Sequence, residues 1–381
     1  MRHIQFGRPM IGGAEKEAVM RVLDGPILVH GPLSKQFESE FAAFTGAAHA
    51  VSVANCTAAM HLAYFHLGLG PGDAVIVPAQ THVATAHAVE FTGARPIFVD
   101  AEPATGNIDI ARIEAALTPE VKAIAVVHFL GRPVDMDGVN AVARKHNLFV
   151  VEDCALAVGT SLNGAHAGTL GHVGCFSFYP VKHMTTGEGG MLTTNDPEIA
   201  RRIERQRAFG VDRHMGERTI PGVYDVTMLG YNYRMSEIAA ALGIEQLKRV
   251  QGFLDRRRAN YAALDAGLRE LDEIELFEPS REGYGHSHYC LSFLLKKELA
   301  DKRLDLVEHL KANGVGTSCY YPRPVPHMAY YREKYGYGLD TFPVASRISY
   351  ASVALSVGPH LGEEDMAYMV ETIKEGLARI R

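Results

Sequence analysis

The sequence predicts an α/β protein whose mainly parallel sheet is covered by helices on both faces, with a smaller second domain. Between residues 48 and 151, short apolar runs alternate with helical stretches, the pattern of parallel strands that are buried on both faces. A chain of 381 residues is too long for one ordinary core. Its composition, 47% hydrophobic and 22% charged, is that of a globular protein.

The elements of the large domain follow from hydrophobic periodicity and turn residues. Two amphipathic helices are expected first, over residues 15–23 and 32–46. Strands are expected at 48–54, 74–77, 96–99, 123–128, 148–151 and 173–178. The intervening helices are expected at 57–67, 82–90, 110–117 and 136–145. Since ligands bind at the carboxyl ends of parallel strands, the residues that follow each strand are candidate site residues.

The rest of the chain predicts a smaller α+β domain. We expect residues 1–245 to form the large domain and 246–381 the small one, connected by a long helix over about 236–271. A break in that helix is expected near Gly243 or Gly252. The arginine run 256–258 is interpreted as a solvated face, with a phosphate-binding role as the alternative. Strands at 289–295 and from 314 onward, and helices over 305–313 and 363–377, complete this domain.

Composition excludes several function classes. The formal charge is −6, from 38 basic and 44 acidic residues, so no nucleic-acid partner is expected. No apolar stretch approaches the ~20 residues that span a bilayer, and residues 1–9 lack the apolar core of a secretory signal. Five widely spaced cysteines indicate reduced thiols in a cytoplasmic protein. His286 and His288 have no third ligand nearby in the sequence, so no metal site is expected.

The strongest candidate site lies in residues 173–190. An apolar run stops at Pro180, Lys182 follows at once, and no charged residue lies between His172 and Lys182. A lysine placed at a strand end in apolar surroundings is expected to have a lowered pKa and a nucleophilic amine. The alternative is a solvated loop lysine. The hydroxyl of Ser177 is a candidate ligand for an anion such as phosphate.

Other polar residues follow the neighbouring strands. Cys56 and Thr57 open a helix whose free backbone N–H groups suit a phosphate. His82, His128 and Asp153 also stand at or just beyond strand ends. Each has a plain structural alternative: Thr57 as a helix cap, Asp153 as a turn cap, and the histidines as hydrogen-bonded core residues. Together with Lys182 they suit pyridoxal phosphate, which needs a lysine, an anionic partner for its ring nitrogen, a phosphate cup and a stacking face.

Residues 177–190, S-F-Y-P-V-K-H-M-T-T-G-E-G-G, resemble the lysine segment of the DegT/StrS family of nucleotide-sugar aminotransferases. Further segments that resemble the family occur in order at 55–59, 68–73, 78–85, 151–155 and 229–235. The resemblance runs from about Gly7 to the last helix. It implies a fold-type I pyridoxal-phosphate enzyme, with a mainly parallel seven-stranded sheet in the large domain and a smaller C-terminal α+β domain.

The resemblance also implies roles for the strand-end residues. Lys182 would carry the cofactor as an internal aldimine and shuttle the proton between Cα and C4′. Asp153 would pair with the pyridine nitrogen and keep it protonated. Cys56 and Thr57 would bind the phosphate, with Ser177 beside them.

Further site residues follow from the same resemblance. His82 stands where the family usually has an aromatic residue stacked on the ring. Asn232 would reach the phosphate of the neighbouring subunit, so the enzyme would be a homodimer with shared active sites. His183, Tyr321 and His327 are candidate substrate contacts.

The function implied is ping-pong transamination. An amino donor, L-glutamate, would convert the cofactor to pyridoxamine phosphate, which would aminate a nucleotide-linked keto deoxy sugar for amino-sugar and cell-surface polysaccharide synthesis, such as that of lipopolysaccharide O-antigen. The alternatives are a sugar dehydratase of the same family and a non-catalytic, amino-sugar-binding or regulatory member. The presence of Lys182 and Asp153 favours transamination. Leu156 departs from the family, which commonly has glutamine there, so contacts to the ring 3′-oxygen or to substrate are expected to differ.

Overall fold

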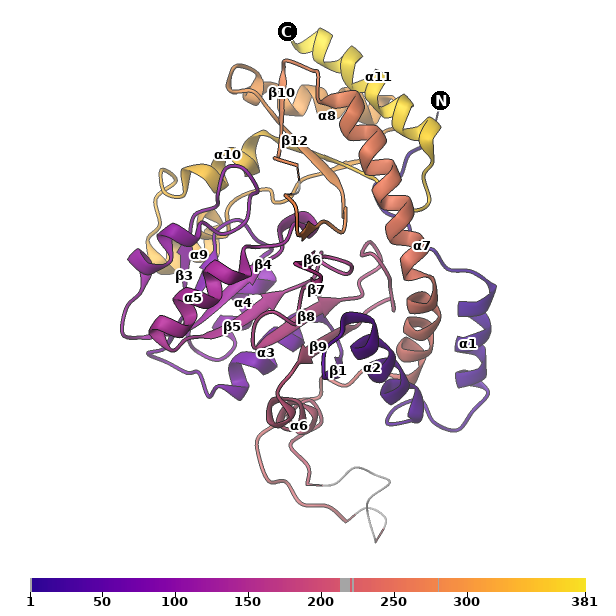
Figure 1. Ribbon diagram of the computed structural model, residues 1–381, viewed down its shortest axis with the longest axis vertical. Coiled ribbons are helices and arrows are strands. Elements are labelled where there is room, and N and C mark those ends of the chain that lie inside the picture. Colours follow the sequence, from indigo (N-terminus) through magenta and orange to yellow (C-terminus); the bar gives the residue numbers. More distant parts are fainter. Residues whose placement is uncertain (1, 213–219, 221–222, 280) are drawn as a thin grey trace.

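The computed structural model describes residues 2–212, 220, 223–279 and 281–381, and its centre is a seven-stranded sheet (Figure 1). The strand order is β1-β9-β8-β5-β4-β2-β3. The strands are β1 (His49–Val53), β2 (Ala74–Pro78), β3 (Arg95–Val99), β4 (Val121–Val127), β5 (Phe149–Asp153), β8 (Val173–Ser177) and β9 (Gly190–Thr194). β1 and β8 both pair antiparallel with β9, while β8, β5, β4, β2 and β3 pair in parallel. The predicted, mainly parallel sheet is therefore confirmed, and β9 is its one reversed strand.

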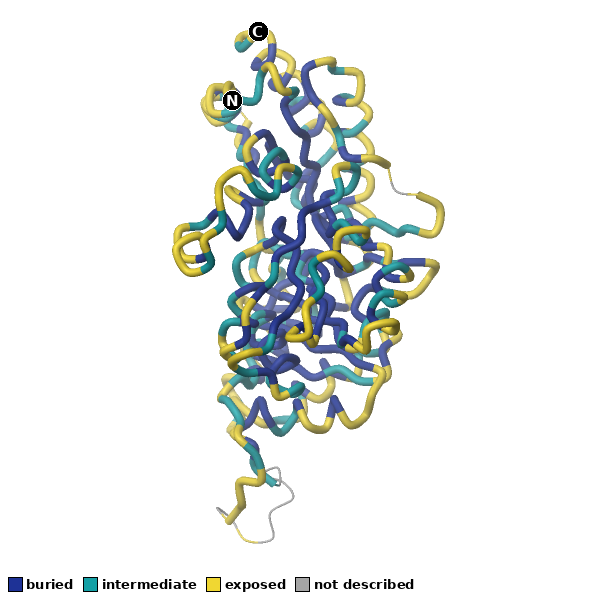
Figure 2. Tube along the Cα trace, turned by 90° about the vertical axis from the view of Figure 1, so that its left-hand side faces the viewer, coloured by how far each residue is buried: buried dark blue, intermediate teal, exposed yellow. Residues whose placement is uncertain are grey.

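Helices cover both faces of this sheet. One apolar cluster joins the sheet to α3 (Cys56–His66), α4 (Val83–Glu90) and α6 (Pro197–Gln206). The opposite face packs against α2 (Pro32–Thr45), α5 (Met136–His146) and α7 (Glu237–Leu268). Successive strand residues face opposite clusters, as Val150 and Val151 do, which explains why the strands are apolar throughout. Figure 2 shows the buried trace along the centre and exposed segments around it.

A second, antiparallel sheet has the order β10-β12-β14-β13. Its strands are β10 (Ile274–Leu276), β12 (Leu291–Leu295), β13 (Thr317–Ser318) and β14 (Ser352–Leu355). It shares a core with α8 (Arg303–Ala312) and α11 (Glu363–Ile380). Ile4 from the start of the chain joins this core through a bridge to Val315. α7 contributes Ile244 to a core of the large sheet and Leu264 to the core of the small one, so the predicted boundary at residue 245 falls inside a helix that serves both.

Several smaller elements complete the described chain. They are α1 (Gly13–Leu23), α9 (Ala329–Tyr335), α10 (Pro343–Ala351), and a small sheet of β11 (Tyr284–Gly285), β6 (Ser161–Leu162) and β7 (Ala165–His166). None of the helices in the described residues is both long and apolar enough to cross a membrane.

Three expectations were wrong in detail. Residues 110–117 form two short 3₁₀ turns, Ile110–Arg112 and Glu114–Ala116, in place of an α-helix, and the Asp109 carboxylate caps the first by accepting from the N–H of Ala111. α7 continues unbroken through both of its predicted weak points, since its packing outweighs the low helix propensity of glycine. Arg257 is not part of a solvated face: it is only 6% exposed and donates to the carbonyl of Tyr289.

The reversed strand β9 meets the start of α3 at Gly190. A Cβ added there would lie 2.5 Å from the carbonyl carbon of Asn55 and 2.7 Å from the nitrogen of Cys56. No heavy atom can be accommodated at these distances, so the helix start packs directly on the glycine backbone. Glycine at this position therefore sets where the first turn of α3 lies.

We predict that Gly190→Ala lowers the free energy of unfolding by about 1–3 kcal/mol, because the added methyl group forces the start of α3 away from β9. Gly252→Ala is the matched control, since a Cβ at that helical position meets no atom within 4 Å. It should raise the free energy of unfolding by about 0.5–1 kcal/mol, the helix-propensity gain of alanine over glycine. Urea unfolding followed by circular dichroism measures both, and equal midpoints for the two variants would contradict the close contact at Gly190.

Candidate active site

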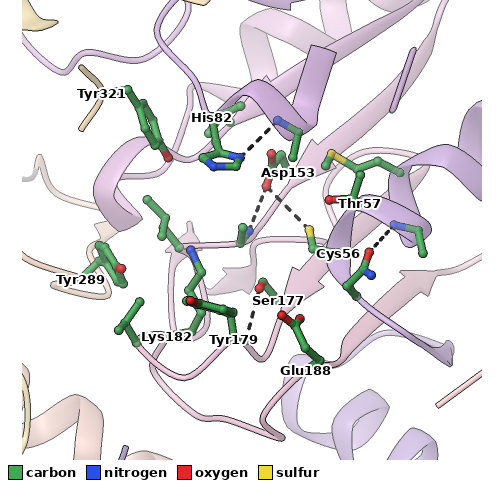
Figure 3. Close-up of a pocket in the computed structure, with 18 of the residues that line it drawn as sticks. Cys56, Thr57, His82, Asp153, Ser177, Tyr179, Lys182, Glu188, Tyr289 and Tyr321 are labelled. Atoms are coloured by element: carbon green, nitrogen blue, oxygen red, sulfur yellow. Dashed lines mark hydrogen bonds between the residues drawn. The ribbon is translucent and has the colours of Figure 1, made fainter. Parts of the chain in front are cut away.

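The carboxyl ends of the parallel strands border a cavity of about 590 Å³. Seven of the residues predicted from the sequence line it: Cys56, Thr57, His82, Asp153, Ser177, Lys182 and Tyr321. Figure 3 shows them around one space, with the amine of Lys182 and the carboxylate of Asp153 on different walls. The parallel sheet explains this gathering, because strands that run the same way end at the same edge.

Lys182 stands in a loop that leaves β8 and returns in β9. The backbone of Phe178 closes this loop, donating to the carbonyl of Gly189 and accepting from Thr186 at 2.9 Å each. The Lys182 Nζ lies 5.4 Å from the centre of the Tyr289 ring. Burial lowers the pKa of the Lys182 amine, and the negative charge of Asp153 partly opposes that shift. The surroundings thus favour a neutral, nucleophilic amine.

Asp153 is held in one orientation by neutral donors. Its Oδ1 accepts from the N–H of Ala155 at 3.0 Å, and its Oδ2 accepts from the hydroxyl of Thr85 at 2.7 Å. The Thr85 oxygen lies 2.7 Å from the hydroxyl of Thr81, which therefore donates to it. No cation pairs with this carboxylate among the described residues, so its charge is available to a positively charged group in the cavity. Thr85 was not predicted from the sequence, although it lies in the 78–85 segment.

The start of α3 forms an anion cup. Asn55 is the N-cap, and its side chain accepts from the N–H of Ala58 at 2.8 Å. Thr57 is therefore not the cap, and its hydroxyl stays available beside the first N–H groups of the helix, which lack intrahelical acceptors. Ser177 adds a second hydroxyl from the end of β8. This donor set suits a phosphate group.

His82 presents an uncharged ring to the cavity. Its Nδ1 accepts from the N–H of Ala84 at 3.2 Å, so the ring proton lies on Nε2. Partial burial lowers the pKa of His82, against the opposing effect of Asp153. The ring of Tyr321 meets it at 5.7 Å, inclined at 62°. A flat, neutral imidazole is thus presented as a stacking surface.

Three predicted site residues lie elsewhere. Asn232 is exposed outside the cavity and accepts from the Nε of Arg234 at 3.0 Å. His183 is 2% exposed and its Nε2 donates to the carbonyl of Ser287, and His327 is fully buried, with its Nε2 3.2 Å from the hydroxyl of Thr341. Neither histidine reaches the cavity, so the expectation that both contact substrate is corrected. The ring of His183 packs against that of Tyr289 at 5.6 Å, and the ring of His327 against that of Phe342 at 6.2 Å.

Sequence reasoning predicted seven of the 21 residues that line the cavity. The residues it did not assign to the cavity are Asn55, Met60, Phe91, Val127, Tyr179, Glu188, Tyr233, Tyr289 and Tyr320, with a few small apolar neighbours. Tyr179 and Glu188 could have been predicted from their position in the lysine segment 177–190, and Tyr320 from its position next to Tyr321. Leu156 is 2% exposed and gives the wall an apolar surface where a glutamine is common in the family.

His128, Glu152 and Cys154 lie close enough together to be considered as metal ligands. The geometry argues against such a site. The Nδ1 of His128 accepts from the N–H of Val134 at 3.1 Å, so its Nε2 donates to Glu152 at 2.9 Å. The Glu152 oxygens also accept from three backbone N–H groups, those of Gly168, Leu170 and Gly171. The lone pairs that a metal would need are therefore occupied by protons of the protein.

The residues that line the cavity fit pyridoxal phosphate. One wall offers a single amine, a second a fixed carboxylate, a third a helix start with two hydroxyls, and a fourth a flat neutral ring. These are the four features that the cofactor needs. Their placement on separate walls matches a molecule with its aldehyde, ring nitrogen and phosphate at different corners.

Comparisons with known proteins agree with this description. The model of the DegT/DnrJ/EryC1/StrS aminotransferase family matches residues 9–374. The chain is 36% identical over 376 residues to the spore coat polysaccharide biosynthesis protein SpsC of Bacillus subtilis, covering 98% of this chain and 96% of that protein. It is 35% identical over 376 residues to the GDP-perosamine synthase of Escherichia coli O157:H7, covering 98% and 99%. The solved PLP form of Spr1654 from Streptococcus pneumoniae superposes with a TM-score of 0.94 at 26% identity, over 100% of both chains.

We predict that Lys182 of the cofactor-free protein reacts with an amine reagent at lower pH than a surface lysine does. Burial lowers its pKa below the ordinary 10.5, so a larger fraction is unprotonated near neutrality. Mass spectrometry of the labelled peptides measures the pH midpoint, with exposed Lys16 as the internal control. Tyr289→Ala should move the Lys182 midpoint to higher pH, because it admits water to the amine. Identical midpoints for the two lysines would contradict the dry environment.

Proposed function

Because the chain belongs to the DegT/DnrJ/EryC1/StrS aminotransferase family, we propose that it transfers an amino group from L-glutamate to the keto group of a nucleotide-linked deoxy sugar. The family makes it a pyridoxal-phosphate-dependent sugar aminotransferase. The observation that carries the proposal is the amine of Lys182 and the carboxylate of Asp153 around one cavity. The names of the two relatives, a GDP-perosamine synthase and a spore coat polysaccharide protein, support a role in making amino sugars for cell-surface polysaccharides.

Each residue has a task that follows from its position. When bound, pyridoxal phosphate supplies an aldehyde that holds the amino group and a ring that takes up the electron pair released at the reacting carbon. Asp153 keeps a proton on the ring nitrogen, and Thr85 fixes the carboxylate for that contact. The Nζ of Lys182 takes the proton from the donor's α-carbon and returns it to the product. Proton transfer by a positioned group typically contributes about 10²–10⁴-fold to the rate.

The binding contacts divide between the phosphate and the ring. Cys56, Thr57 and Ser177, which line the cavity, would hold the phosphate through N–H and hydroxyl donors. His82 would offer its ring as the stacking surface, supported from the side by Tyr321. Lys182 is the one lysine among the described residues that line the cavity, so the amino donor and the acceptor sugar must use its amine in turn. This supports a ping-pong order, in which 2-oxoglutarate leaves before the sugar binds.

The assembly we infer is a homodimer with shared active sites. Asn232 does not contact a cofactor in the cavity of its own chain in this conformation, because this exposed residue lies outside that cavity. Apolar side chains gather on the same segment, with Ile220, Val223, Val226 and Leu229 exposed by 54–70%. Such a cluster is typical of a surface that another chain covers. A second copy that places Asn232 at the phosphate explains both features.

The cellular setting we infer is the cytoplasm. All five cysteines are unpaired thiols, four of them buried, which is typical of a reducing compartment. The net charge of −6 favours a small-molecule substrate over nucleic acid.

We predict that L-glutamate alone releases about one 2-oxoglutarate per active site, as a ping-pong order requires. Adding a nucleotide-linked keto sugar should then give an amino sugar, in which nitrogen replaces oxygen. Lys182→Ala should reduce both half-reactions by at least about 10²–10⁴-fold, since the proton transfer is lost, while the protein still retains the cofactor after gel filtration. Coupled assay and product mass spectrometry measure this.

The control is Lys16→Ala, on the exposed face of α1, which should match the wild type. A product that has lost water would indicate dehydration instead. Substantial transamination by Lys182→Ala would overturn the role of that lysine, and a wild type without glutamate turnover would overturn the donor assignment.

We predict that two defective variants complement each other. Lys182→Ala removes the amine from the cavity of the protomer that carries it. Asn232→Asp places a negative charge against the phosphate bound in the cavity of the other protomer. Mixed dimers contain one intact site, so reassembly of equal amounts should restore about a quarter of the wild-type activity in a twofold-symmetric dimer. Assays of mixtures after dissociation and dialysis measure this. Activity no higher than the mean of the two variants would contradict shared sites.

A further inference from the structure

Two tyrosine hydroxyls in the cavity bond to each other. The Oη atoms of Tyr289 and Tyr320 lie 2.8 Å apart, and both residues line the cavity. Their rings meet nearly at a right angle, 88°, with centres 5.4 Å apart. Neither hydroxyl takes part in the contacts assigned so far to the phosphate, the ring or the proton transfer.

The proton count of this pair leaves one donor for a ligand. The pair contains two hydroxyl hydrogens, and one of them is used between the two oxygens. Either oxygen could donate across this contact, but Tyr289 is 3% exposed and its Oη has no other hydrogen-bond partner among the described residues. The arrangement that uses the hydrogen of Tyr289 is therefore the one in which Tyr289 donates to Tyr320 Oη. Tyr320 is only partly buried, and its own hydrogen remains for an acceptor in the cavity. Burial raises the pKa of both hydroxyls, so both stay protonated at neutral pH.

The main chain on each side of the pair is fixed. Gln80, 1% exposed, donates from its Nε2 to the carbonyl of Tyr320 at 2.8 Å, and its Oε1 accepts from Ser349 at 3.1 Å. Arg257 donates from its Nη1 to the carbonyl of Tyr289 at 2.7 Å and lies over the ring, 5.9 Å from its centre. No carboxylate lies within ion-pair distance of Arg257 among the described residues. Burying a cation without an ionic partner costs free energy of folding. A role in positioning Tyr289 gives a physical reason why Arg257 is buried here.

The pair lies next to the reacting amine. Tyr289 is the residue whose ring faces the Nζ of Lys182 at 5.4 Å, and Figure 3 shows it beside that lysine, on the side of the cavity that Tyr321 also borders. A donor here meets the part of a substrate that reacts. A site that binds a carboxylate of the substrate is expected to offer it a cation. A neutral pair of phenol hydroxyls suits instead a neutral hydroxyl or ring oxygen of a sugar.

We propose that the hydroxyl of Tyr320 donates a hydrogen bond to an oxygen of the acceptor sugar, that Tyr289 orients this hydroxyl, and that Arg257 and Gln80 are positioning residues for the pair. This rests on the proposed function, because it takes the acceptor to be a nucleotide-linked sugar. The amino donor makes no use of the bond. The pair therefore sets the specificity of the second half-reaction without affecting the first.

The test compares Tyr320→Phe and Tyr289→Phe with the control Tyr350→Phe, an exposed tyrosine on α10 outside the cavity. The probe is the nucleotide-linked keto sugar that the wild type aminates fastest in a panel that includes GDP-linked sugars. Calorimetry in the Lys182→Ala background gives its Kd without turnover. Tyr320→Phe should raise this Kd and lower kcat/KM for the sugar about 3- to 10-fold, the usual value of one neutral hydrogen bond. Tyr289→Phe should have a smaller effect on both quantities, and the rate of the glutamate half-reaction should stay the same in Tyr320→Phe.

Arg257 is tested through its coupling to the pair. Arg257→Gln should weaken sugar binding when Tyr289 is present and have no further effect in the Tyr289→Phe background, while Arg257→Lys should retain part of the affinity. Unchanged sugar binding by Tyr320→Phe would overturn the proposal, as would an equal loss in the glutamate half-reaction. A wild type that aminates no sugar in the panel would overturn the proposed function itself, and this result is distinct because it appears before any variant is compared.

Discussion

The cavity depends on the parallel pairing of β5 with β8, which a buried carboxylate secures. Asp153 pairs in register with Cys175, two residues before Ser177, so the carboxylate and the lysine segment start from the same rim of the sheet. Glu152, fully buried beside Asp153, accepts hydrogen bonds from the loop that leads into β8, through the N–H groups of Gly168, Leu170 and Gly171. With the ring of His128 as a fourth donor, its charge is satisfied without a cation, and the loop is held in place.

Around this rim, each functional group is oriented by a neighbour that has no chemical task of its own. Thr85 aims the carboxylate of Asp153, Asn55 caps the helix that forms the anion cup, and Tyr289 shields the amine of Lys182 from water. Thr85 lies on α4, Asn55 is the N-cap of α3, and Tyr289 lies two residues before β12. Such preorganisation lowers the reorganisation needed when charge develops during the reaction.

Much of the site could be predicted from the sequence because polar residues at strand ends converge in any parallel sheet. Cys56, Thr57, His82, Asp153, Ser177 and Lys182 were placed at one site in this way, Tyr321 was added from the family resemblance, and one cavity contains all seven. β9 was not predicted, because its residues Gly190–Thr194 directly follow the glycines of the lysine loop and look like a continuation of that loop. His183 and His327 were misplaced because adjacency to a site residue does not determine which way a side chain points.

The sequence by itself determined the fold class, the family and the identity of the reactive residues, because these depend on periodicity, on turn residues and on motifs that are local in the chain. The tertiary structure decided which residues meet across long separations. Tyr289 lies against Lys182, and Arg257 is buried behind Tyr289 instead of facing water, as its place in a run of three arginines suggested. Such contacts arise where the small sheet and α7 pack against the strand ends, and no local pattern encodes the approach of segments that lie far apart in the chain.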